Sequence, residues 1–209
     1  SDFCYMTSHD KLTVWTSNYS REFYKKRGNY IEIGGLEVAR KDDDDRMLEL
    51  IRKVGSGKAF GTKAYMISAA EAREKFPLLE EDQIQGSMWD PEAGLVTPRS
   101  QKVAGDLVDE AVASGKLKTF AYTPATKVLV EDGVAVGVET PKGTIMADHV
   151  VLCAGIWGSL ISETANVKLP LMPLEHPLLF FGPWDHLERT GKDIVYPLLR
   201  DQGNSAYVL

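Results

Sequence analysis

One short segment constrains the fold of this chain more than any other. Residues 150–153 are the apolar run Val-Val-Leu-Cys, and Ala154 and Gly155 follow at once, before a helical pattern near residues 157–166. An apolar run without polar alternation is typical of a strand covered on both faces. Open α/β sheets bind ligands at the carboxyl ends of such strands, and Gly155 has no Cβ to obstruct a close approach. The segment therefore predicts either a ligand-binding turn or a tight packing turn between a strand and a helix.

The composition is ordinary for a globular protein, with 44% hydrophobic and 26% charged residues. The net charge of -6 leaves no basic excess to pair with phosphates, so we expect no nucleic-acid or membrane partner. Cys4 and Cys153 are far apart and form no metal-like pair, and we expect reduced thiols, no metal site and a cytoplasmic location. The chain starts on Ser1 and stops inside a strand-like pattern, which indicates a piece of a longer protein.

Periodicity and turn residues predict mixed helices and strands. Helices are expected over residues 11–27, over residues 47–54 after an acidic start, after a capping box at Ser68, and after a cap at Thr97 and Pro98. Two apolar faces are predicted to be buried, Leu12, Trp15, Tyr19 and Phe23 on the first helix and Val103, Leu107 and Ala111 on the last. Strands are expected over residues 30–40 with a bend, 84–89, 117–122, 126–131, 134–140, 144–146, 174–181, 194–199 and 205–209.

Two motifs that resemble ligand sites have simpler explanations. Residues 55–58, Gly-Ser-Gly-Lys, lack the spacing and the hydroxyl residue of a phosphate-binding loop, and we interpret them as a flexible loop that ends a helix. The four aspartates at residues 42–45 lack the alternating spacing of a calcium loop, and we interpret them as a solvated helix start.

A series of short motifs resembles the FAD-dependent amine oxidoreductases that act on N-methylated glycines, such as the dimethylglycine and sarcosine oxidising enzymes. Each motif is weak alone, but their order and spacing are specific from about Thr7 to the end of the chain. They are residues 34–39 (GGLEVA), 76–79 (FPLL), 90–98 (DPEAGLVTP), 126–128 (TKV), 153–157 (CAGIW), 170–176 (PLMPLEH), 196–201 (YPLLRD) and 205–207 (SAY).

The resemblance implies a mixed α/β (α+β) fold in two parts. Residues 1–97 and 169–209 would form a substrate-binding domain, a mixed or antiparallel sheet with helices. Residues 98–168 would form the second part of a discontinuous FAD-binding domain of βαβ type. The family's first βαβ unit, with its G-x-G-x-x-G phosphate-binding motif, is not found in this sequence.

The resemblance also assigns roles to individual residues. Val128 matches a strand whose backbone meets the adenine, and Ala154, Gly155 and Trp157 match a turn that lies along the cofactor. His176 and Tyr207 match an active-site histidine and tyrosine. From the residues alone, a lone histidine such as His176 is more often structural than catalytic.

The implied activity is oxidation of a dimethylglycine- or sarcosine-like amine by hydride transfer to FAD. A small-molecule amine or amino-acid substrate follows, as does a C-terminal folate-binding domain in the parent protein. Two alternatives stay open, a glycine or D-amino acid oxidase-like enzyme and a non-catalytic interaction module.

We predict that the isolated chain purifies colourless and inactive. FAD affinity depends heavily on a glycine-rich loop at a helix N-terminus, and the sequence contains no such loop. Visible absorbance of the purified chain is the measurement, and a yellow preparation with stoichiometric flavin would contradict the prediction.

Overall fold

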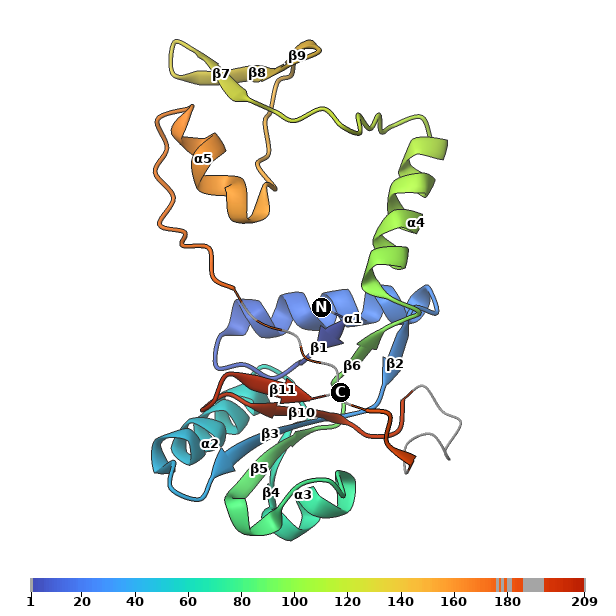
Figure 1. Cartoon of the computed structure of the whole chain (residues 1–209), viewed down its shortest axis with the longest axis vertical. Coiled ribbons are helices and arrows are strands. Elements are labelled where there is room, and N and C mark those ends of the chain that lie inside the picture. Colours follow the sequence, from blue (N-terminus) through green and yellow to red (C-terminus); the bar gives the residue numbers. More distant parts are fainter. Residues whose placement is uncertain (1, 176, 178, 180–181, 186–193, 209) are drawn as a thin grey trace. The chain divides into compact units, whose positions relative to one another are not determined.

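A computed structural model describes residues 2–175, 177, 179, 182–185 and 194–208 (Figure 1). The chain divides into two compact units, one formed by Ser1–Ala111 and Pro183–Leu209 and the other by Val112–Gly182. The fold is mixed α/β, as predicted, and in the described ranges no helix is long and apolar enough to cross a membrane. The assignment of the two units to substrate and cofactor binding stays a prediction.

The first unit is built on a five-stranded sheet with the order β11-β10-β3-β5-β4 (Figure 1). β10 pairs with β3 in parallel, and the other neighbours pair antiparallel. Segments from both ends of the chain thus share one sheet. Its strands are β3 (Gly35–Arg40), β4 (Tyr65–Ser68), β5 (Ile84–Asp90), β10 (Leu198–Asp201) and β11 (Ala206–Val208).

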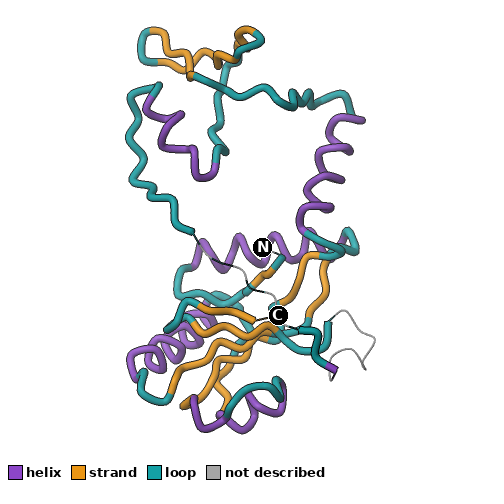
Figure 2. The backbone as a smooth tube through the Cα atoms, viewed as in Figure 1, coloured by secondary structure: helices purple, strands orange, loops and turns teal. Residues whose placement is uncertain are grey.

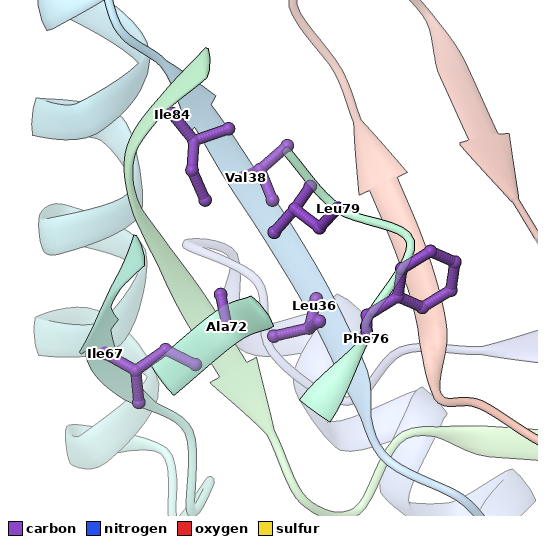
Figure 3. Packing of buried hydrophobic residues seen from close by; sticks show 7 residues of the cluster. All are labelled: Leu36, Val38, Ile67, Ala72, Phe76, Leu79 and Ile84. Atoms are coloured by element: carbon purple, nitrogen blue, oxygen red, sulfur yellow. The ribbon is translucent and has the colours of Figure 1, made fainter. Parts of the chain in front are cut away.

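Successive residues of β3 point to opposite faces of this sheet, and apolar side chains on each face pack against a helix. Ala39 and Met88 pack with Leu50 and Val54 of α2 (Asp44–Ala59). The opposite face packs against α3 (Ala69–Lys75), which begins with the predicted capping box at Ser68 and is followed by the short 3₁₀ helix η1 (Glu81–Gln83). Figure 3 shows the core on that side, formed by Leu36, Val38, Ile67, Ala72, Phe76, Leu79 and Ile84.

A second, three-stranded sheet in the first unit has the order β1-β6-β2. The predicted strand over residues 30–40 is divided between the two sheets, and the bend lies at Gly34. Gly34 has a φ of +77°, and a Cβ there would overlap the indole of Trp89, so only glycine fits. The strands are β1 (Phe3–Cys4), β2 (Tyr30–Glu32) and β6 (Gly94–Val96).

The prediction that the apolar stripe of the first helix is buried is wrong. α1 (Lys11–Lys26) buries Val14 and Arg21, whereas Leu12, Trp15 and Tyr19 are 67%, 62% and 65% exposed. Periodicity identified the apolar stripe, but α1 contacts the unit through its opposite side. There the guanidinium of Arg21 pairs with Glu92 at 2.6 Å, and this buried ion pair orients the helix.

Residues 55–58 are helical, which corrects the predicted loop. α2 continues through both glycines to Ala59, and a Cβ at Gly57 would collide with the hydroxyl of Thr62. Position 57 therefore requires a glycine, because the segment around Thr62 passes too close to the helix for a side chain. The acidic start is confirmed, because the Asp43 carboxylate accepts the N–H of Arg46 at 2.9 Å.

The helix predicted from Thr97 and Pro98 begins later, at Ser100. The Thr97–Pro98 peptide is cis, and the Ser100 N–H donates to the Asp2 carboxylate at 2.6 Å. A residue distant in sequence therefore replaces the predicted local cap. Along α4 (Ser100–Ala113) only Val103 of the predicted stripe is buried, while Leu107 and Ala111 are partly exposed.

The second unit contains an antiparallel three-stranded sheet with the order β7-β8-β9, as the sequence predicted for these residues. Long loops connect it to the flanking segments (Figure 2). A 3₁₀ turn, η2 (Gly155–Trp157), leads into α5 (Gly158–Glu163), which is shorter than expected. The strands are β7 (Lys127–Glu131), β8 (Val134–Thr140) and β9 (Gly143–Met146).

Three predicted strands are corrected. Residues 117–122 and 150–153 form no strand, and neither do the described residues of 174–181. Val151, expected in a strand buried on both faces, is 81% exposed, and Leu152 is 39% exposed. Within the described part of the second unit β7, β8 and β9 pair only with one another, so residues 150–153 have no neighbouring strand to complete their backbone hydrogen bonds.

A buried ion pair joins α2 to the middle of the large sheet. Lys53 Nζ lies 2.8 Å and 2.9 Å from the two carboxylate oxygens of Glu37, and the side chains are 7% and 1% exposed. When two opposite charges are buried as a pair, their attraction offsets much of the free energy lost by removing them from water. A single buried charge without its partner lowers the stability strongly.

We predict that Lys53→Met lowers the free energy of unfolding of the chain by about 3–5 kcal/mol, because it strands the Glu37 carboxylate in the core. The measurement is urea unfolding followed by circular dichroism. Lys102→Met removes an exposed pair with Asp106 and should change the stability by less than about 0.5 kcal/mol. Equal effects of the two substitutions would contradict a special cost at Glu37.

Candidate functional site

The predicted cofactor turn forms a tight bend in the second unit. The N–H of Trp157 donates to the carbonyl of Ala154 at 3.0 Å and closes η2. Trp157 and Ile156 are 62% and 60% exposed, so the apolar side chains of this turn face outward. The turn therefore presents apolar surface that the described residues of its own unit do not cover.

Gly155 provides the clearest test of whether the turn can accept a ligand. Its φ of +53° favours glycine, and a Cβ built there would meet no atom within 4 Å. Packing among the described residues therefore does not require a glycine, and the backbone is accessible at this point. A flat ligand could approach the peptide closely, which fits the predicted contact with FAD.

Val128, the other predicted cofactor residue in this unit, is buried in β7. Its backbone N–H donates to the hydroxyl of Thr164 at 2.9 Å, and this hydroxyl donates to the carbonyl of Ile161 at 2.6 Å. The side of β7 that faces away from β8 is thus linked to the end of α5. An adenine bound to the backbone of Val128 would have to replace the Thr164 hydroxyl or use the carbonyl alone.

The predicted catalytic residues have different outcomes. His176 lies outside the described residues. Tyr207 lies on β11 in the first unit, 43% exposed, with its ring packed edge-on against Phe3 at a centroid distance of 5.2 Å. Directly opposite Tyr207, on β10, lies Arg200, to which the sequence analysis assigned no role.

The first unit also contains an apolar cleft of about 900 Å³. Phe76, Tyr196 and Val208 line it, and Arg99 and Asp2 form a 3.5 Å ion pair among its lining residues. Val208 and Tyr207 are neighbours on a strand, so their side chains point to opposite faces of the sheet. Tyr207 therefore points to the face of the large sheet opposite the one from which Val208 lines the cleft.

Comparison with known proteins identifies the family. The family model of FAD dependent oxidoreductases matches residues 7–209, almost the whole chain. The chain belongs to this family. The cofactor of the family is FAD, which agrees with the accessible backbone at Gly155.

Three relatives show how far the similarity extends. The chain is 33% identical to human mitochondrial sarcosine dehydrogenase over 197 residues, which is 90% of this chain and 20% of that protein. It is 30% identical to the mouse mitochondrial pyruvate dehydrogenase phosphatase regulatory subunit, over 85% of this chain and 21% of that protein. The fold matches the crystal structure of L-proline dehydrogenase from P. horikoshii with a TM-score of 0.78 and 23% identity, covering 99% of this chain and 55% of that one. The chain thus spans about a fifth of the length of the two curated relatives, the dehydrogenase and the regulatory subunit.

We predict that Gly155→Val in the full-length protein lowers the flavin content of the purified enzyme. The new side chain would occupy the space into which the cofactor is expected to fit, and the positive φ adds a strain of about 1–2 kcal/mol. Gly133→Val is the matched control, since Gly133 also has a positive φ of 80° and open space around it. The ratio of flavin to protein absorbance decides the outcome, and equal losses in both variants would mean that only backbone strain matters.

Proposed function

We propose that the chain is part of a flavin-dependent oxidoreductase that oxidises an N-methylated glycine, a dimethylglycine- or sarcosine-like amine. The observation that carries the proposal is the 33% identity to human sarcosine dehydrogenase along 90% of the chain. In this assignment the first unit binds the substrate and the second unit holds part of the FAD.

The chemistry requires a neutral amine. Bound FAD would supply the acceptor for a hydride from the carbon next to the nitrogen. The amine must lose its proton for the nitrogen lone pair to assist, so the site has to favour the uncharged form. We assign this task to His176 and Tyr207, which would orient the amine and take its proton.

The cofactor side of the proposal rests on Val128, Ala154, Gly155 and Trp157. The outward apolar side chains of the turn, the open space at Gly155 and the exposed run at residues 150–153 all fit a surface that further structure covers. We propose that residues 150–153 become a buried strand when the glycine-rich βαβ unit of the family lies beside them. A folate-binding domain would follow in the parent protein.

A second candidate function is non-catalytic. The observation that favours it is the 30% identity of the chain to a protein named as a regulatory subunit. A glycine or D-amino acid oxidase-like activity is the enzymatic alternative. The three candidates differ in which amine, if any, reduces the flavin.

Anaerobic mixing separates these candidates. The full-length protein, purified with its flavin, is mixed with sarcosine, dimethylglycine, glycine and a panel of D-amino acids, and bleaching of the flavin absorbance is followed. The proposal expects the fastest bleaching with sarcosine or dimethylglycine. Faster bleaching with glycine or a D-amino acid supports the enzymatic alternative, and no bleaching with any amine supports the regulatory one.

We predict that His176→Gln and Tyr207→Phe each reduce turnover of the full-length enzyme by about 10–10⁴-fold, the range for an acid–base or orienting group. The rate of flavin reduction against pH is the measurement. Phe23→Leu, on an exposed stretch of α1, serves as a control that should leave the rate unchanged. Unchanged rates in both active-site variants would remove them from the mechanism.

A further inference from the structure

The rings of Phe3 and Tyr207 join the two sheets of the first unit. Phe3 lies on β1 of the small sheet, and Tyr207 lies on β11 of the large sheet, at the opposite end of the chain. The ring centroids are 5.2 Å apart and the ring planes form an angle of 84°, an edge-to-face arrangement that aromatic pairs prefer. The contact therefore acts on the orientation of the tyrosine that the proposed function assigns to the amine.

The strand that carries Tyr207 fixes its backbone but not its ring. β11 is an edge strand of three residues, and all three are exposed. Pairing with β10 sets the register of the backbone, whereas the side-chain torsions depend on what the ring contacts. A tyrosine that is 43% exposed keeps several rotamers unless a neighbouring side chain restricts it. Contact with the ring of Phe3 supplies such a restriction.

Phe3 is held in place by the residues on either side of it. Before it, the carboxylate of Asp2 accepts the N–H of Ser100 at 2.6 Å. After it, the hydroxyl of Tyr5 donates to the carbonyl of Leu36 in β3 at 3.1 Å. The segment is therefore anchored to the start of α4 and to the large sheet, and Phe3 is the fixed member of the aromatic pair.

We propose that Phe3 is a positioning residue, which holds the ring of Tyr207 in the orientation in which its hydroxyl meets the substrate amine. The inference rests on the proposed function, because it takes Tyr207 to act on the amine. The side chain of Phe3 has no group that exchanges a proton, so it acts through the tyrosine. An aromatic pair of this kind changes the population of the held orientation by about 2–10-fold, and the rate of a step that requires this orientation changes with it.

Substitution of Phe3 in the full-length enzyme tests the role. Phe3→Ala should lower the rate of flavin reduction at saturating amine by about 2–10-fold, with a smaller change in KM. The amine used is the one that bleaches the flavin fastest, so the test does not depend on the identity of the substrate. Phe3→Tyr keeps an aromatic ring and should restore most of the rate. Trp15→Ala is the matched control, because it removes another aromatic pair of the same unit, the stack of Trp15 and Tyr19 at 5.8 Å, and should leave the rate unchanged.

A double-mutant cycle separates positioning from a general structural effect. If Phe3 acts through the hydroxyl of Tyr207, Phe3→Ala should change the rate little when Tyr207 is already phenylalanine. A loss of the same factor with and without Tyr207→Phe, or an unchanged rate in Phe3→Ala alone, overturns the proposal. If Phe3→Ala fails to fold, Phe3→Leu keeps the apolar bulk without the ring and carries the same comparison.

A measurement on the ring itself keeps this test separate from the proposed function. The chain is labelled with fluorotyrosine, and the fluorine NMR signal of Tyr207 is assigned by its loss in Tyr207→Phe. The ring current of Phe3 should displace this signal, so Phe3→Leu should move it towards the position of an exposed tyrosine, and Trp15→Ala should leave it in place. A signal that moves in Phe3→Leu supports the positioning contact even if no amine reduces the flavin. A signal that Phe3→Leu leaves in place overturns the proposal even if sarcosine is oxidised.

Discussion

The geometry of the first unit depends on the hydrogen bonds that the buried carboxylate of Asp90 accepts. Asp90 ends β5 and accepts the N–H groups of Met6, Thr7 and Glu92 at 3.0–3.2 Å, together with the Thr7 hydroxyl at 2.8 Å. It therefore joins the start of the chain to the centre of the large sheet. Burial raises the pKa of Asp90, and the bonds that it accepts oppose this shift and favour the ionised form.

The position of the Tyr5 ring follows from this anchor. Tyr5 directly precedes the two residues that Asp90 holds, and its hydroxyl binds carbonyls of β3 and β10. The ring in turn supports the guanidinium of Arg200. One buried carboxylate thus orders residues from three distant parts of the sequence.

Short-range sequence signals predicted much of the first unit, because the ends and bends of its elements are determined by residues close in sequence. The capping box at Ser68, the acidic cap at Asp43 and the bend at Gly34 each concern neighbouring residues and a fixed geometry. Periodicity was less informative about contacts. It identified the apolar stripe of α1, but the buried pair of Arg21 and Glu92 decides which side faces inward. The same limit applies to α4, whose cap is the distant Asp2.

The run at residues 150–153 marks the point where a sequence pattern ceases to determine local structure. Its apolar character indicates burial on both faces, but a strand forms only where neighbouring backbones complete its hydrogen bonds. The register of two strands raises the same difficulty for the candidate site. The resemblance assigned Tyr207, while its partner Arg200 became visible only when β10 and β11 were paired. Residues that act together across a sheet have no fixed spacing in sequence, so a motif can indicate one of them and miss the other.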